Sequence, residues 1–109
     1  MKVEVSKDVL KDIKKGITIL NNDFFISFKD KVLIDNEKCY GKIDYNSFMI
    51  EVSSDYPIKK INETITHEIM HGLDEAYNIG LKEKQIKLLG KAIHKLFLDN
   101  KKGIKDYYI

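Results

Sequence analysis

The segment from Ile61 to Gly80 constrains the fold most, because its apolar residues recur with the period of an α-helix. At about 100° per residue, a single broad arc is apolar and contains Ile65, Ile69, Met70, Leu73, Ala76 and Tyr77. The polar residues lie mainly on the other side. We expect Asn62 or Thr64 to cap this helix, and Gly80 to end it in a left-handed conformation.

The polar side carries the pattern His67-Glu68-Ile69-Met70-His71, in which two histidines are four residues apart. On a helix they lie about 40° apart, so both imidazoles can reach one metal ion. Glu68 projects beside that ion, where it can take a proton from a zinc-bound water. The spacing therefore predicts a catalytic zinc site. The alternative is that both histidines are solvated polar residues of an amphipathic helix.

A catalytic zinc site needs a third protein ligand and an open position. Asp74 shares the ligand face but lies about 10 Å further along the helix axis than His67, which favours a supporting role or plain solvation. His94 is deep in the following helix and is expected at the surface. Glu83 is the best candidate, provided that the two helices cross steeply. The alternative is that Glu83 binds no metal and is present because the helix dipole favours an acid in the first turn of a helix.

Charge, cysteine content and hydropathy restrict the class of protein. The 109 residues are expected to form one domain, 1–109, and the net charge of +2 gives no reason to expect nucleic-acid binding. Cys39 is the only cysteine, so neither an internal disulfide nor a cysteine-rich zinc site can form. We find no signal-like or membrane-spanning apolar run, and therefore expect a cytoplasmic protein without a membrane partner.

The remaining segments predict an α+β fold, with N-terminal antiparallel strands and a β-hairpin followed by the H-E-x-x-H helix and a second packing helix. The expected strands are 24–28, 31–34 and a hairpin over 39–53. The second helix is expected over 82–99, with an apolar stripe of Ile86, Leu89, Ile93, Leu96 and Phe97. Residues 6–15 could form a short helix, and the tail 101–109 could dock or stay loose.

The chain resembles the ImmA/IrrE-type metallopeptidases, and most closely their small phage-encoded relatives. The resemblance covers about residues 39–99 and rests on Gly41-x-Ile43-Asp44-Tyr45, Glu63-Thr64-Ile65-x-His67-Glu68-Ile69-x-His71 and Glu83-x-x-Ile86-x-x-Leu89-Gly90. It implies a zincin-like domain with a third glutamate ligand at the start of the second helix. Longer members of that family cleave or inactivate transcriptional repressors, which suggests an intracellular protein or peptide substrate.

The resemblance implies that His67, His71 and Glu83 bind Zn²⁺ and that Glu68 is the general base of a zinc-dependent metallopeptidase. A residue that stabilises the oxyanion stays open among Tyr45, Tyr56 and Tyr77. The alternative function is a non-catalytic protein-binding module in which zinc ties two helices together. Glu68 distinguishes the two, because a structural zinc site has no use for an acid at that position.

Overall fold

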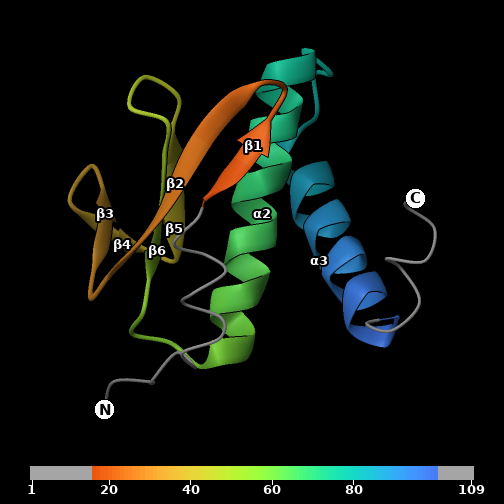
Figure 1. Cartoon of the computed structure of the whole chain (residues 1–109). Coiled ribbons are helices and arrows are strands. Elements are labelled where there is room, and N and C mark those ends of the chain that lie inside the picture. Colours follow the sequence, from red (N-terminus) through yellow and green to blue (C-terminus); the bar gives the residue numbers. More distant parts are fainter. Residues whose placement is uncertain (1–15, 101–109) are drawn as a thin grey trace.

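A computed structural model of the chain describes residues 16–100. Within this range a strand-rich first half is followed by two helices (Figure 1), which confirms the expected α+β class. The short helix considered for residues 6–15 and the tail 101–109 lie outside the described residues. None of the described helices is long and apolar enough to cross a bilayer.

In the part of the chain that the structure describes, six strands form a sheet of four and a separate hairpin. The sheet has the order β1-β2-β6-β5 and contains β1 (Ile17–Ile19), β2 (Asn22–Lys29), β6 (Met49–Ser53) and β5 (Gly41–Asp44). The hairpin pairs β3 (Val32–Ile34) with β4 (Glu37–Cys39).

The central pair of the sheet is parallel, contrary to the expected antiparallel arrangement. Phe25 pairs with Met49 and Lys29 with Ser53 in the β2–β6 ladder, whereas β1–β2 and β5–β6 are antiparallel. Parallel neighbours require a long connection between them. Residues 30–48 supply it, because the β3–β4 hairpin and β5 bring the chain back before β6 begins.

The hairpin expected over 39–53 is present as β5–β6, but its boundaries differ. Cys39 pairs with Val32 in the β3–β4 hairpin and does not belong to β5. Phe48 lies in the turn before β6 with a φ of 53°, not in the strand. β1 was not expected at all, because three residues are too short to establish a strand period.

The first helix, α2, runs from Ile58 to Tyr77, so it begins earlier than expected. Pro57 precedes it, and the Pro57 carbonyl accepts hydrogen bonds from the backbone N–H groups of Lys60 and Ile61. Thr64 lies inside the helix, where its hydroxyl donates to the Lys60 carbonyl at 2.8 Å. The expected caps at Asn62 and Thr64 were therefore wrong, because Pro57 already fixes the start.

The C-terminus of α2 also differs by two residues from the expectation. Asn78 supplies the left-handed cap, with φ 52° and ψ 49°, and its N–H donates to the Asp74 and Glu75 carbonyls. Gly80 also has a positive φ, of 86°, but it lies in the connection rather than at the cap. Asparagine tolerates this conformation better than most residues, so either position could have ended the helix.

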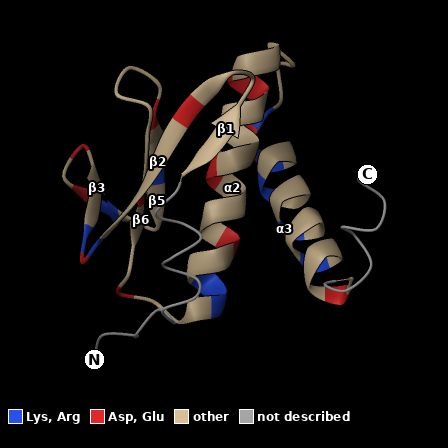
Figure 2. Cartoon of the chain, in the orientation of Figure 1, with Lys and Arg blue, Asp and Glu red and all other residues tan. Residues whose placement is uncertain are grey.

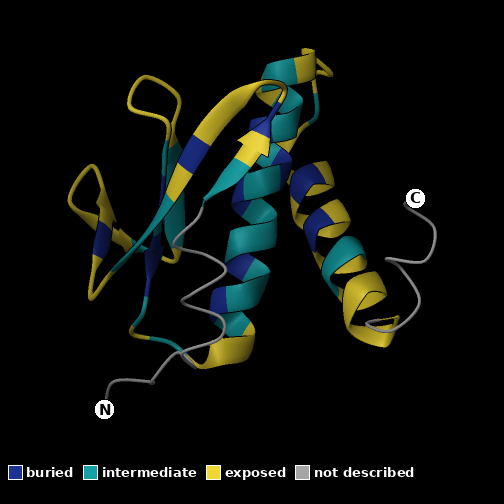
Figure 3. Ribbon diagram, viewed as in Figure 1, coloured by how far each residue is buried: buried dark blue, intermediate teal, exposed yellow. Residues whose placement is uncertain are grey.

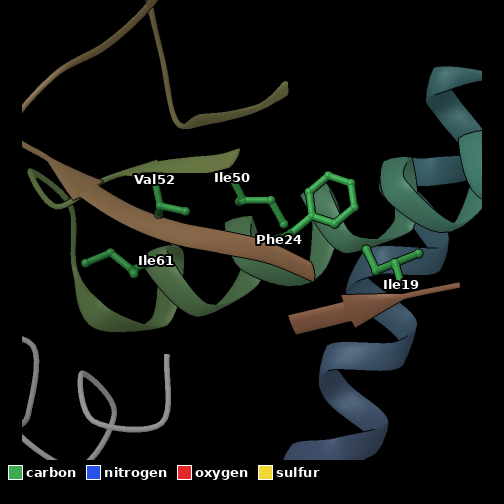
Figure 4. Close-up of a cluster of buried hydrophobic side chains, with 5 residues drawn as sticks. All are labelled: Ile19, Phe24, Ile50, Val52 and Ile61. Atoms are coloured by element: carbon green, nitrogen blue, oxygen red, sulfur yellow. The ribbon is translucent and has the colours of Figure 1, made fainter. Parts of the chain in front are cut away.

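The core lies between the sheet and one face of α2 (Figure 4). Its buried cluster is formed by Ile19, Phe24, Ile50, Val52 and Ile61. Four residues of the predicted apolar arc pack against this cluster: Ile65, Ile69, Leu73 and Ala76. Met70 is buried as well. Tyr77 was expected in this arc but is 58% exposed, because it is the last residue of the helix.

The second helix, α3 (Glu83–Asp99), packs on α2 on the side away from the sheet (Figure 1). Ile86 and Gly90 are its buried residues. The predicted stripe is therefore covered only in part: Ile93 is half-buried, whereas Leu89, Leu96 and Phe97 are exposed among the described residues (Figure 3). The molecule has three layers in the order sheet, α2, α3.

Candidate metal centre

Three side chains from the two helices converge on one point. His67 and His71 come from α2, and Glu83 is the first residue of α3. The Nε2 of His67 lies 3.2 Å from one Glu83 oxygen, and the Nε2 of His71 lies 3.0 Å from the other. The three potential ligand atoms lie within 4.8 Å of one another. The structure thus brings together the three residues that the sequence singled out as metal ligands.

These separations fit a zinc ion as well as they fit hydrogen bonds. Zinc–nitrogen and zinc–oxygen bonds of about 2.0–2.1 Å at a tetrahedral angle place neighbouring ligand atoms roughly 3.3 Å apart. The two histidine–glutamate distances are close to that value. Both histidines are partly buried and Glu83 is about half exposed, so the cluster is not closed off from solvent. The donor set therefore suits a metal with an open coordination position.

Asp74 positions Glu83 by organising the connection between the helices. One carboxylate oxygen, Oδ1, accepts hydrogen bonds from the N–H groups of Gly80 at 2.9 Å and Leu81 at 2.8 Å. The N–H of Lys82 then donates to the Gln85 side chain at 2.8 Å, which fixes the first turn of α3. Asp74 lies outside the cluster of His67, His71 and Glu83 and bonds backbone groups, which fits the supporting role considered from the sequence.

The sequence argument required the two helices to cross steeply if Glu83 was to reach the histidines. The connection over residues 78–82 turns the chain so that the start of α3 lies against the middle of α2, where Glu83 contacts His67 and His71. Gly90 makes this close approach possible, because an added Cβ would lie 3.3 Å from the Cα of His67. Glu83 and Gly90 both lie against His67 although they are seven residues apart on α3, which agrees with helices that cross rather than run side by side.

Glu68 is the unusual residue of the centre, because it is a buried acid with 6% exposure. Its carboxyl makes no hydrogen bond or ion pair with any residue that the structure describes. Burial raises the pKa of Glu68 to about 7, and the negative charge of Glu83 acts in the same direction. A carboxyl with such a perturbed pKa beside a cluster of ligands is a candidate for proton transfer.

The sheet covers Glu68 through Gly41, the first residue of β5. An added Cβ at Gly41 would lie 2.7 Å from a methyl group of Thr64 and 2.9 Å from the Glu51 carbonyl oxygen, and 3.6 Å from the Glu68 Cγ. Only glycine allows the strand to pass so close to α2. Sequence reasoning gave this residue no role. A glycine inside a strand pattern was the available signal, because it often marks such an approach.

The surroundings of His67 favour the form that binds a metal. Burial lowers the pKa of His67, and positive charge on His71 and on Lys87 acts in the same direction, while Glu83 opposes it. A neutral imidazole is the form that binds a metal. Tyr45 fixes the other histidine indirectly, because its hydroxyl donates to the backbone carbonyl of His71 at 3.0 Å.

The other residues considered from the sequence lie apart from the ligands. His94 was expected at the surface but is half-buried on α3, and its Nε2 is buried without a hydrogen-bond partner among the described residues. The Tyr56 ring packs on the Tyr40 ring at 4.6 Å between centroids. Tyr77 is exposed at the end of α2. Of the three tyrosines considered, Tyr45 is the one that hydrogen-bonds one of the three clustered residues, through the backbone carbonyl of His71.

Two imidazoles and a carboxylate around one point, with a buried acid beside them, can hold a metal ion and move a proton next to it. Neither the protein-family models, nor the curated proteins, nor the solved structures with which the chain was compared match it. The functional conclusion therefore rests on the geometry and chemistry of these residues.

Proposed function

We propose that this protein is a zinc-dependent metallopeptidase with a zincin-like site that hydrolyses peptide bonds of an intracellular protein or peptide. His67, His71 and Glu83 hold the ion, and Glu68 is the catalytic base. The single observation that carries the proposal is the burial of Glu68 directly beside the three converging ligands. The resemblance to the ImmA/IrrE-type metallopeptidases points the same way and makes a repressor-like protein a reasonable substrate.

Zinc bound by this set supplies Lewis acidity towards a peptide carbonyl and acidifies water to about pKa 7. The protein's own residues supply the rest. A cation close to Glu68 favours its ionised form, so the raised pKa of the metal-free protein falls when the site is filled. Glu68 then accepts a proton from the attacking water at its carboxylate oxygen and passes it to the leaving amine.

Tyr45 and Asp74 support this centre from outside. Tyr45 holds the His71 backbone, and Asp74 shapes the chain that leads to Glu83. In this proposal both are positioning residues, because the Tyr45 hydroxyl and the Asp74 carboxylate bond backbone groups. Residues that orient ligands typically change metal affinity or activity by roughly 10- to 100-fold when removed.

A zinc-stabilised binding module without catalysis would need the same three ligands. It would gain nothing from Glu68, however, because a buried carboxyl without a hydrogen-bond partner destabilises a fold. A chain that only tied α2 to α3 through zinc would be more stable with an apolar or amide residue at this position. The presence of a buried acid at position 68 therefore favours the peptidase over the binding module.

The test is zinc content together with hydrolysis, on wild type, Glu83→Ala and Glu68→Gln. Wild type should hold about one zinc per chain by elemental analysis. Glu83→Ala should lose zinc affinity by more than the roughly 10- to 100-fold typical of a supporting residue. Glu68→Gln should keep its zinc and lose hydrolysis of a casein or peptide mixture by roughly 10²- to 10⁴-fold.

The matched control is Glu75→Ala, which removes an exposed acid of α2 outside the ligand cluster and should leave both properties unchanged. Absence of zinc from wild type supplied with the ion would refute the proposal. Full hydrolysis by Glu68→Gln would refute the assignment of the base, and zinc without any hydrolysis would leave the binding module.

A further inference from the structure

A cavity of about 320 Å³ opens directly beside the metal centre. It lies between α2 and α3, and the Tyr40 side chain borders it next to the start of β5. One ligand, His67, contributes to its wall. A group bound in this cavity would therefore lie next to the reacting peptide bond. The residues of its wall that carry charge are Lys60, Glu63, Lys87 and Lys91.

Two of these four charges already have partners. The Lys60 ammonium lies 4.0 Å from the Glu63 carboxylate, one turn further along α2. It also lies over the Tyr40 ring, 4.1 Å from the centroid. Lys60 and Glu63 therefore cancel each other in charge, and the ring of Tyr40 holds the ammonium in place.

The other two lysines come from α3 and have no such partner. Lys87 and Lys91 are four residues apart, so they lie on the same face of the helix. Neither forms an ion pair or hydrogen bond with a residue that the structure describes. Figure 2 shows lysines in the first turns of α2 and along α3, the two helices that enclose the cavity. Like charges at this spacing repel each other, and a bound anion relieves the repulsion.

Resting on the proposed peptidase function, we propose that this cavity binds a carboxylate of the substrate and so selects peptides with a negative charge close to the scissile bond. Lys87 and Lys91 supply the recognition. The carboxylate can belong to an Asp or Glu side chain or to the free C-terminus of a peptide. The chemistry is the same, and a peptide with an amidated C-terminus distinguishes the two sources.

The test uses a mixture of random decapeptides, prepared with free and with amidated C-termini, and digested by the zinc-loaded protein. Mass spectrometry of the products should find Asp and Glu enriched over Asn and Gln by roughly three- to tenfold at one position near the cleaved bond, as expected for two solvent-exposed ion pairs. Enrichment in the amidated mixture assigns the side chain. Cleavage of the free mixture alone assigns the C-terminus.

The variant Lys87→Gln/Lys91→Gln should lose this enrichment and keep its zinc. The matched control is Lys31→Gln/Lys59→Gln, which removes the same charge from exposed positions outside the cavity and should keep the enrichment. Cleavage without a preference for acids, or a preference that survives in Lys87→Gln/Lys91→Gln, overturns the inference.

A second measurement separates this inference from the proposed function. The amidated mixture is passed over immobilised, zinc-loaded Glu68→Gln protein, and the retained peptides are eluted with salt and sequenced. Acid enrichment that depends on Lys87 and Lys91, without cleavage by wild type, would refute the peptidase and keep the carboxylate site. Retention without acid enrichment, or no retention at all, would refute the site, whether or not wild type cleaves peptides.

Discussion

Glu68 lies where water barely reaches it, and no described residue compensates its charge by a hydrogen bond. In the metal-free protein its ionisation therefore weakens the fold. A pKa of about 7 in place of 4.5 corresponds to a cost of roughly 3 kcal/mol when the carboxyl is charged. Such a destabilising carboxyl is explained most simply by a functional role, here the proton transfer proposed for Glu68.

The cost predicts a pH-dependent difference between wild type and Glu68→Gln without metal. Between pH 4.5 and about 7 the folded wild type binds more protons than the unfolded chain, so its stability falls as the pH rises through this window. Glu68→Gln lacks this loss and should be more stable at pH 8, by up to roughly 3 kcal/mol, and much less so at pH 4.

Urea denaturation in the presence of a chelator measures this difference. Glu75→Gln, at an exposed position of the same helix, is the control for the loss of one negative charge. A stability difference between Glu68→Gln and wild type that stays constant from pH 4 to pH 8 would contradict the burial of an ionisable carboxyl.

At the scale of single residues, His67, Glu68 and His71 could be selected from the sequence because their relation depends only on the helical period. Glu83 could be named as the best of three candidates because it was expected in the first turn of the next helix. The burial of Glu68 could not be predicted. It depends on the close passage of Gly41, whose strand is distant in the sequence.

At the scale of elements, the connection between α2 and α3 decides where the third ligand lies. Five residues reverse the chain, and Asn78 and Gly80 both take positive φ. The Asp74 carboxylate holds this reversal through two backbone N–H groups. The Asp74 side chain thereby links α2 to the first turn of α3, which starts with Glu83.

Asp74→Ala should therefore weaken both stability and metal binding. Loss of two hydrogen bonds to a charged acceptor is expected to cost about 1–3 kcal/mol in unfolding free energy. Zinc affinity should fall by roughly tenfold, because Glu83 is no longer held in position. Asp74→Asn keeps an acceptor oxygen and should lie close to wild type. Competition with a zinc-binding dye measures the affinity; equal affinities for Asp74→Ala and wild type would contradict the positioning role.

Most helices and strands could be predicted from local sequence patterns, but which strands pair with each other could not. The two helices and the β5–β6 hairpin follow from periodicity and turn residues. The parallel β2–β6 pair and the assignment of Cys39 to β4 depend on which strands meet in space. The start of α2 at Ile58, directly after Pro57, lies before the segment 61–80 in which the helical period of apolar residues was found.

At the scale of the whole molecule, α3 packs mainly on α2 within the described structure (Figure 1). Its buried contacts there are those of Ile86 and Gly90, while much of its remaining surface is exposed. A metal ion held by His67, His71 and Glu83 would add a second link between the same two helices. Zinc should therefore stabilise α3 more than the sheet.

We expect zinc at about 100 times its dissociation constant to stabilise the protein by about 2.7 kcal/mol. For a domain of this size that corresponds to a rise in Tm of roughly 10–20 °C. Differential scanning fluorimetry measures the shift, and hydrogen exchange should slow most in α3. Mg²⁺, which prefers six oxygen ligands, and zinc added to Glu83→Ala are the controls. An equal rise in Tm with Glu83→Ala would contradict this link.

The parallel β2–β6 ladder also has a consequence for the order of folding. β2 and β6 can pair only after residues 30–48 have closed a loop between them. The conformational entropy of the loop is lost before the β2–β6 contacts form. The β1–β2 and β5–β6 hairpins and the α2–α3 pair form between neighbours in the sequence. The kinetically slow event therefore belongs to the middle of the sheet, whereas the three residues proposed to bind the metal lie on two helices that are neighbours in the sequence.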